Sequence, residues 1–345
     1  MNKPVSAISY IQNQVEYHRI LHTVALELTY KCNLDCFFCY NDRNKKGTPL
    51  SLEDYQVLLQ DLAEMQTLNL MLTGGEPMIH PHFFAIGAIT RELGFITRIR
   101  TNGHSLSKNV CRRLKQEVDP YEVEVSLHGA TPEVHDKQTR ICGSFDRLVS
   151  NIGHAKEAGL RIRSVTTPTK WNEHQIPELF DLTESLDIPL RFQGPVSPRD
   201  NGDNSPLSIQ PLQGTWNKIH ELHTKRKENY DKKTNSADTQ YENDRLAEQM
   251  IKLEKRTCSV GVDGVDIDPY GNVQACMHLQ ESAGNIHHQS IKDIWADSAL
   301  FARARSRAEK ISKSFGDIPV RQFGAPLYCL AVEENFEKKF AGPIN

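Results

Sequence analysis

Three closely spaced cysteines, Cys32, Cys36 and Cys39, are the residues of this chain best suited to chemistry. Their spacing is C-x-x-x-C-x-x-C, and the next cysteine is Cys111. Thiolates are the usual ligands of iron–sulfur clusters, and a 4Fe–4S cubane has one more iron than this loop has thiolates. The fourth iron would stay open to another molecule, which suits catalysis better than structure. The alternative is a zinc site, because cysteine-rich zinc loops also use short spacings.

Aromatic residues surround these cysteines: Phe37, Phe38 and Tyr40. Such an apolar sheath favours a redox cluster, since burial tunes its potential. The spacing resembles the signature of the radical S-adenosylmethionine (radical SAM) enzymes. The resemblance implies a 4Fe–4S cluster whose open iron binds the amino and carboxylate groups of S-adenosylmethionine (SAM). Reductive cleavage would then give a 5′-deoxyadenosyl radical that abstracts a hydrogen atom from the substrate.

Further motifs resemble the same family's cofactor-binding segments. Gly74-Gly75-Glu76-Pro77 matches the GGEP motif, which implies contact with the amino group of SAM. Thr101 and Asn102 match the TNG segment near the cofactor, and Ser126 stands where relatives approach the ribose. Tyr40 stands where an aromatic residue often contacts the adenine.

Two positions keep alternatives open. Arg140 matches a position where relatives bind the carboxylate of SAM, for which a guanidinium is well shaped, but an ordinary surface arginine is the alternative. His128 replaces the usual aspartate of the family. It is a candidate substrate or acid–base residue, and a structural histidine is the alternative.

A second group of cysteines begins at Cys258. The pattern from Cys258 through Gly271 to Cys276 is C-x12-G-x4-C, and residues 265–273 have the alternation of a hairpin. With a helix starting near Ser290, this resembles the SPASM or twitch module of radical SAM enzymes, which carries auxiliary 4Fe–4S clusters. Full modules have more cysteines, so the resemblance implies one auxiliary cluster at most.

Cys329 has three possible roles in this module. It is the third ligand of the auxiliary cluster beside Cys258 and Cys276, a free thiol that donates a hydrogen atom while Cys258 and Cys276 alone bind metal, or a small core residue. In the first case a substrate group, water or His278 would complete the cluster. We expect the remaining cysteines, Cys111 and Cys142, to be small core residues.

The elements that must position these residues alternate between short apolar strands and amphipathic helices. The predicted strands are residues 24–29, 68–72, 95–100, 121–127, 160–166 and 188–193, and the predicted helices include 52–65, 106–117, 145–158 and 175–186. Ser51 and Asp54 form a capping box before the first of these helices. Six strands are short of a closed TIM barrel, so we predict an α/β fold with a partial (β/α)6 barrel. Substrates should bind at the carboxyl ends of its strands.

The domain boundaries that we predict are an N-terminal extension (1–22), the barrel (23–195), a linker with charged helices (196–256) and a small α+β SPASM/twitch-like module (257–345). The net charge of −3 gives no reason to expect a nucleic-acid or membrane partner. No stretch reads as a signal peptide or membrane span, which predicts a cytoplasmic protein.

The architecture resembles that of radical SAM enzymes that modify ribosomally made peptides by crosslinking, epimerisation or oxidation. The expected partners are a peptide substrate, a separate leader-peptide-binding protein and an electron donor such as flavodoxin or ferredoxin. The alternatives are a radical oxidoreductase acting on a sugar alcohol or a tetrapyrrole side chain, and a zinc-binding interaction protein without turnover.

Overall fold

The computed structural model describes residues 18–194, 196–212, 214–234, 261–277 and 279–314. Its centre is one nine-stranded sheet with the order β6-β5-β4-β3-β2-β1-β7-β8-β9. The strands are β1 (Thr23–Glu27), β2 (Asn69–Thr73), β3 (Ile96–Thr101), β4 (Glu122–Ser126), β5 (Ile162–Thr166), β6 (Leu190–Phe192), β7 (Gly264–Ile267), β8 (Asn272–Cys276) and β9 (Leu279–Asn285). β1 to β6 are parallel and neighbour one another in chain order, as in a partial barrel.

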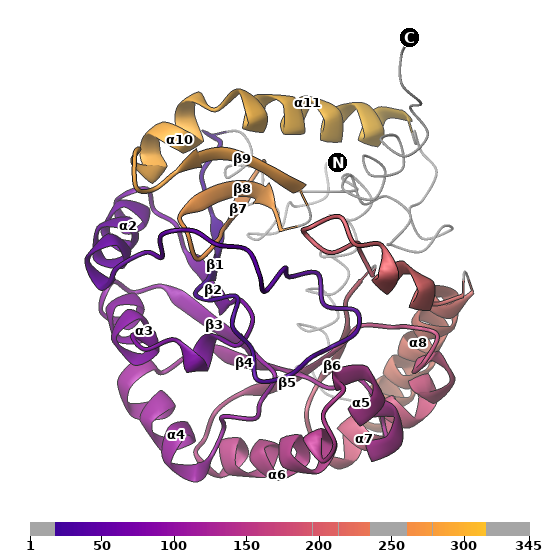
Figure 1. The fold of residues 1–345 in the computed structure, drawn as a ribbon. Coiled ribbons are helices and arrows are strands. Elements are labelled where there is room, and N and C mark those ends of the chain that lie inside the picture. Colours follow the sequence, from indigo (N-terminus) through magenta and orange to yellow (C-terminus); the bar gives the residue numbers. More distant parts are fainter. Residues whose placement is uncertain (1–17, 195, 213, 235–260, 278, 315–345) are drawn as a thin grey trace, which may run out of the picture.

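Helices cover the outer face of this curved sheet, and the first loop crosses the carboxyl ends of the strands (Figure 1). The helices are α2 (Leu52–Glu64), α3 (Phe83–Glu92), α4 (Lys108–Arg113), α5 (Pro132–Thr139), α6 (Ser144–Glu157), α7 (Ile176–Ser185), α8 (Thr215–Thr234), α10 (Ile291–Asp297) and α11 (Ala299–Ser314). Short turns of helix are η1 (Pro77–Ile79), η2 (Leu114–Val118), η3 (Glu173–Gln175) and η4 (Ser205–Ile209). The partial (β/α)6 barrel predicted from the sequence is confirmed.

Alternation along each strand separates the core from the barrel interior. In β3, Thr97 and Ile99 are buried toward the helices, whereas Arg98 and Arg100 lie on the opposite face. The apolar core between sheet and helices is continuous, with Leu26, Leu72 and Ile99 at most 1% exposed. The inner face is therefore free to carry polar groups.

The C-terminal hairpin continues the barrel sheet. β7 pairs in parallel with β1, and β8 and β9 follow antiparallel. The sequence predicted the hairpin and the helix that starts at Ser290, which caps α10 through its side chain. It did not predict that main-chain hydrogen bonds join the hairpin to the strand that leads into the cysteine loop.

The predictions made from short stretches of sequence were confirmed only in part. The capping box of Ser51 and Asp54 at α2 is confirmed, with both reciprocal hydrogen bonds formed. Cys111 is buried as predicted, but the prediction for Cys142 is wrong, because this thiol is exposed in the turn before α6. Helices α3 and α5 were not predicted, and among the described residues no helix is both long and apolar enough to span a bilayer.

Candidate active site at the mouth of the partial barrel

The loop that carries the three cysteines is fixed to the rest of the mouth by its main chain. The amides of Asp35 and Phe37 donate to the carbonyls of Thr139 and Gln138, at 3.1 Å each, on the last turn of α5. From the other side, Arg199 donates to the carbonyl oxygens of Phe37 and Cys39, both at 2.9 Å. We call residues 29–41 the cluster loop. These contacts hold it over the carboxyl ends of the strands (Figure 1).

All three cysteines line one pocket. Burial raises the pKa of each thiol, that of Cys39 to about 11, and for Cys36 and Cys39 the neighbouring thiolates add to the shift. Three buried thiolates this close together need cations, and the irons of a cluster supply them. Two N–H groups, the amide of Leu34 and Nδ2 of Asn102, already face Cys32 Sγ at 3.4 and 3.7 Å.

The cysteines do not surround a single point. Among the residues that the structure describes, no three His, Cys, Asp or Glu side chains converge on one metal ion. A zinc site needs such convergence, because one ion takes all the ligands. A cubane does not, since each thiolate binds a different iron.

The two glycines after β2 fit beneath the cluster loop. A Cβ on Gly75 would lie 2.3 Å from the carbonyl oxygen of Lys31, and one on Gly74 would lie 2.5 Å from that of Thr29. Gly74 also has φ = +130°, which side chains disfavour. Close approach lets the Gly75 amide donate to Thr29 (2.6 Å) and that of Glu76 to Lys31 (2.9 Å).

The buried carboxylate of Glu76 connects the GGEP segment after β2 to the TNG segment at the end of β3. Its carboxylate is 0% exposed and accepts hydrogen bonds from the Thr101 hydroxyl (2.8 Å), the Asn102 amide (2.8 Å) and the Met78 amide (3.2 Å). Burial raises its pKa to about 7. The side chain thus joins the ends of β2 and β3 beneath the pocket.

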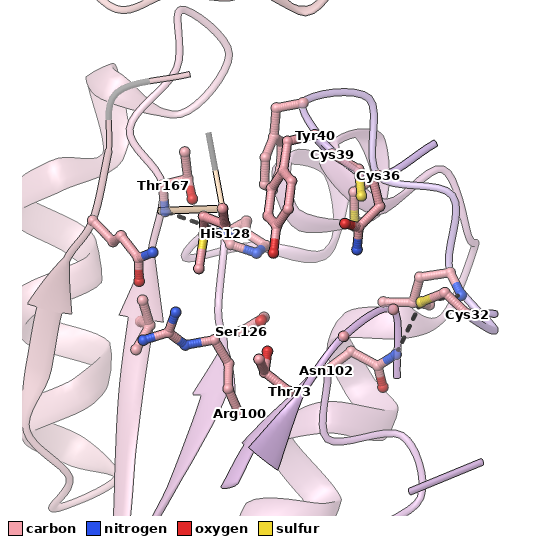
Figure 2. Close-up of a pocket in the computed structure, with 18 of the residues that line it drawn as sticks. Cys32, Cys36, Cys39, Tyr40, Thr73, Arg100, Asn102, Ser126, His128 and Thr167 are labelled. Carbon is pink, nitrogen blue, oxygen red and sulfur yellow. Dashed lines mark hydrogen bonds between the residues drawn. The ribbon is translucent and has the colours of Figure 1, made fainter. Parts of the chain in front are cut away.

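The pocket enclosed by these elements has an empty volume of about 1100 Å³, counting the space that opens to solvent. Ten of the residues predicted to bind the cluster, the cofactor or substrate line it together: Cys32, Cys36, Cys39, Tyr40, Gly74, Gly75, Thr101, Asn102, Ser126 and His128. Figure 2 shows the cysteines on one side of this space and Arg100 on the other, with Tyr40 and Ser126 between them.

Three predicted cofactor residues do not line the pocket: Glu76, Pro77 and Arg140. Arg140 is half-exposed, pairs with Asp35 at 3.2 Å and stacks over the ring of Phe37. It therefore braces the outer side of the cluster loop here, and its contact with the carboxylate of SAM stays a prediction.

His128 is a neutral hydrogen-bond donor rather than a titrating base. Its Nδ1 accepts from the amide of Thr167 (3.3 Å), so the neutral ring carries its proton on Nε2 (Figure 2). Burial and, to a lesser degree, the nearby His135 lower its pKa to about 3. Phe38 of the cluster loop packs edge-on against the ring, with centroids 4.7 Å apart. The predicted role of His128 as a substrate or acid–base residue stays a prediction.

Tyr40 is fixed by an acid from β1. Its hydroxyl donates to Glu27 at 2.6 Å. Burial raises the pKa of Glu27 to about 8, against the lowering effect of this hydrogen bond. The pair orients the phenol ring along the pocket wall, where an aromatic surface suits a purine.

Two buried acceptors in the wall lack a partner within the described part of the chain: Oδ1 of Asn41 and Oε1 of Gln193. Asn41 is 3% exposed. An unpaired buried carbonyl is costly, so both favour a ligand rich in N–H and O–H donors. SAM has such donors in its ammonium, ribose and adenine groups, and the pocket therefore fits it.

The C-terminal hairpin completes the wall. Met277 lines the pocket directly after Cys276, and its amide donates to Asp266 of β7 at 3.0 Å. At the hairpin turn, buried Asp268 accepts from Lys45 (3.0 Å) and Tyr30 (3.4 Å) near the cluster loop. The roles of Cys258, His278 and Cys329 stay predictions, because these residues lie outside the described part of the chain.

Sequence reasoning missed Arg100, Asn41, Gln193 and Arg199. Arg199 acts on a residue 160 positions away in the chain, so no local pattern signals it. Arg100 directly precedes the Thr101-Asn102 motif on the same strand, and its position inside the barrel follows from strand alternation.

These features together define the class of radical SAM enzymes. They are a parallel partial barrel, three cysteines at its mouth, two glycines beneath the cluster loop and a pocket with unpaired hydrogen-bond acceptors. Sequence comparison agrees. The family model described as "Radical SAM superfamily" matches residues 26–183, and the SPASM model, "Iron-sulfur cluster-binding domain", matches residues 258–316. The chain belongs to the radical SAM superfamily and carries a SPASM domain. Its cofactors are a 4Fe–4S cluster, SAM and an auxiliary iron–sulfur cluster.

Named relatives fall into two groups. The chain is 26% identical over 307 residues to the AdoMet-dependent heme synthase of Methanosarcina barkeri, covering 83% of this chain and 85% of the relative. It is 28% identical over 287 residues to the mycofactocin maturase MftC of Mycobacterium tuberculosis, covering 81% of this chain and 71% of the relative.

Solved structures share the fold. Streptococcus suis SuiB superimposes with a TM-score of 0.65 at 18% identity, covering 89% of this chain and 75% of SuiB. The anSMEcpe structure with bound AdoMet gives 0.65 at 15% identity, covering 92% of this chain and 96% of that one.

Proposed function

We propose that this enzyme modifies a ribosomally synthesised peptide by hydrogen-atom abstraction at the pocket described above. When bound, the cluster and SAM supply the reductive cleavage and the abstraction. The protein's own part is positional. The cysteines and glycines hold the cofactor end, Tyr40 and Asn41 line the wall, and the remaining space admits one residue of the substrate.

The observation that carries this proposal is the openness of the pocket. It lies at the carboxyl ends of the strands and opens to solvent beside the cluster loop. A peptide can insert one side chain through such a mouth and keep the rest of its length outside. The maturase relative and the SuiB fold, which was also solved with its precursor peptide SuiA, favour the same substrate class.

Oxidation of a tetrapyrrole side chain is the second candidate. It is favoured by the heme synthase relative, of which the match covers 85%. Either reaction needs an external electron donor of the flavodoxin or ferredoxin kind. In either, an auxiliary cluster near Cys276 would accept the electron released when the substrate radical is oxidised. A separate leader-peptide-binding protein belongs to the peptide proposal alone.

The first test is reductive cleavage of SAM by the anaerobically reconstituted enzyme with dithionite. Replacing Cys36 with alanine should abolish formation of 5′-deoxyadenosine, because the cluster loses a ligand. Cys142→Ala is the matched control, since this thiol is exposed and does not line the pocket. Full cleavage by Cys36→Ala, or its loss in both variants, would contradict the site.

The second test separates the substrate classes. The enzyme is co-expressed with short open reading frames from its own genomic neighbourhood, and the peptides are examined by mass spectrometry. A mass change that depends on Cys36 supports the peptide proposal. An unmodified set of peptides, together with turnover of Fe-coproporphyrin III by the purified enzyme, would favour the tetrapyrrole reaction instead.

A further inference from the structure

The inner face of the barrel carries more positive than negative charge. Four arginines occupy it, alternating with residues that face the core: Arg98, Arg100, Arg163 and Arg191. β4 lies between them and contributes Glu122 and Glu124, in register with Arg98 and Arg100. Two glutamates against four arginines leave an excess of two positive charges on this wall.

Acids on the opposite wall lie close enough to this excess to interact with it. Burial raises the pKa of Asp266 on β7 to about 6, and the charge of Arg100 opposes this rise. Burial also raises the pKa of Glu27 on β1 to about 8, and the carboxylates of Asp266, Asp200 and Asp268 add to this shift. Both carboxyls are therefore easier to protonate than an exposed acid, whereas the arginines stay charged.

Arg100 presents this charge to the pocket. Of the four arginines, it alone lines the pocket. Its Nε and Nη2 donate to Oε2 of Glu124 at 2.9 and 2.7 Å, and Arg191 donates to Oε1 of the same carboxylate at 3.3 Å. Glu124 is 1% exposed. Two arginines thus share one buried carboxylate, and the guanidinium of Arg100 is held rigidly.

The remaining nitrogen of Arg100 is free. Nη1 has no hydrogen-bond partner among the residues that the structure describes, and the side chain is 21% exposed. Thr73 and Ser126 line the same pocket and lie beside the aliphatic stem of Arg100 (Figure 2). A fixed guanidinium edge that opens into a pocket suits a planar oxyanion such as a carboxylate.

We propose that Arg100, held by Glu124 and Arg191, binds a carboxylate of the substrate at the floor of the pocket. In a peptide this group is an aspartate or glutamate side chain or the C-terminus. The cofactor's own carboxylate is the competing source, but the cysteines lie on the far side of the pocket from Arg100 (Figure 2). The inference rests on the proposed function, because it requires substrate to enter this pocket.

The test uses glutarate as a carboxylate probe and glutaramide as its neutral match. Saturation-transfer NMR follows their binding to the SAM-loaded holoenzyme. We expect glutarate to bind the wild type, glutaramide to bind not at all, and Arg100→Met to weaken glutarate about tenfold or more. Arg98→Met is the matched control, since Arg98 lies on the same face of the same strand but does not line the pocket. It should bind glutarate as the wild type does.

Removing Arg100 alone leaves Glu124 with a single partner, so Arg100→Met is paired with the double variant Arg100→Met/Glu124→Met, which removes both buried charges. Equal glutarate binding in the wild type and both variants overturns the proposal, as does no binding to the wild type. Binding of glutarate to the holoenzyme only when SAM is left out overturns it in favour of the cofactor's carboxylate. If an equal concentration of inorganic phosphate displaces glutarate, the assignment of a carboxylate as the ligand of Arg100 is overturned. SAM cleavage without substrate, measured in parallel, reports on the proposed function independently.

Discussion

Replacing Gly75 with alanine tests whether the cluster loop depends on a close approach of two backbones. The added Cβ would lie 2.3 Å from the carbonyl oxygen of Lys31 and 2.7 Å from that of Tyr30. An ordinary C···O contact is about 3.3 Å, so the loop must move by about 1 Å. The obstacle is backbone, which cannot rotate away as a side chain can.

The cost follows from what this shift breaks. The hydrogen bonds from the amides of Gly75 and Glu76 to the cluster loop, at 2.6 and 2.9 Å, contribute about 1 kcal/mol each. Overpacking adds about 1–3 kcal/mol. The total, about 3–5 kcal/mol, is below the stability of most whole domains, about 5–15 kcal/mol. We therefore expect a folded barrel with a displaced cluster loop.

The assay is iron and sulfide content per chain after anaerobic reconstitution, with thermal unfolding of the apoprotein alongside. Gly75→Ala should lose about four irons, the content of one cubane cluster, while keeping a cooperative unfolding transition. Gly153→Ala is the control: this glycine lies in α6 with nothing within 4 Å of the added Cβ, so the variant should keep its iron and gain helix stability. A full iron complement with normal SAM cleavage in Gly75→Ala would refute the reasoning.

Two further perturbations address the supports of the same loop. Arg199→Gln removes two charge-assisted hydrogen bonds to carbonyls of the cluster loop, which together contribute on the order of 2–4 kcal/mol. The variant should therefore lose iron in air faster than the wild type and faster than Arg112→Gln, a control at an exposed site. Equal rates of iron loss would contradict this role of Arg199. Glu27→Gln keeps an acceptor for Tyr40 but removes an acid whose pKa burial raises to about 8. Because the folded state of the wild type holds that proton more tightly, its stability falls as pH rises from about 4.5 to 8, by on the order of a few kcal/mol. The melting temperature of the Gln variant should therefore gain on the wild type across this range, and a constant difference would contradict the buried-acid explanation.

The sequence was informative where function depends on local spacing. The cysteines lie within eight residues of one loop, and the GGEP and TNG motifs end consecutive strands of a parallel sheet. Strand ends in such a sheet meet at one edge, so a shared pocket could be predicted without coordinates. The capping box before α2 was readable for the same local reason.

Long-range contacts set the limit of that reasoning. The motif match placed Glu76 beside SAM, but the structure shows its carboxylate buried against Thr101 and Asn102, which is visible only when β2 and β3 are side by side. Arg199 and Gln193 reach the site from loops that no motif marks. Exposure of Cys142 was missed because its turn ends a helix, α5, that was not predicted.

The attachment of the hairpin to the barrel bears on how electrons could leave the site. β7 pairs with β1, the strand that leads into the cluster loop, and Asp268 ties the hairpin turn to Lys45 and Tyr30. Sheet hydrogen bonds and a buried ion pair allow little rigid-body movement, unlike a flexible linker. A cluster bound through Cys276, at the end of β8, would thus keep a fixed distance from the pocket. Oxidation of a substrate radical by such a cluster would then need no domain closure, because Met277 in the pocket wall directly follows Cys276.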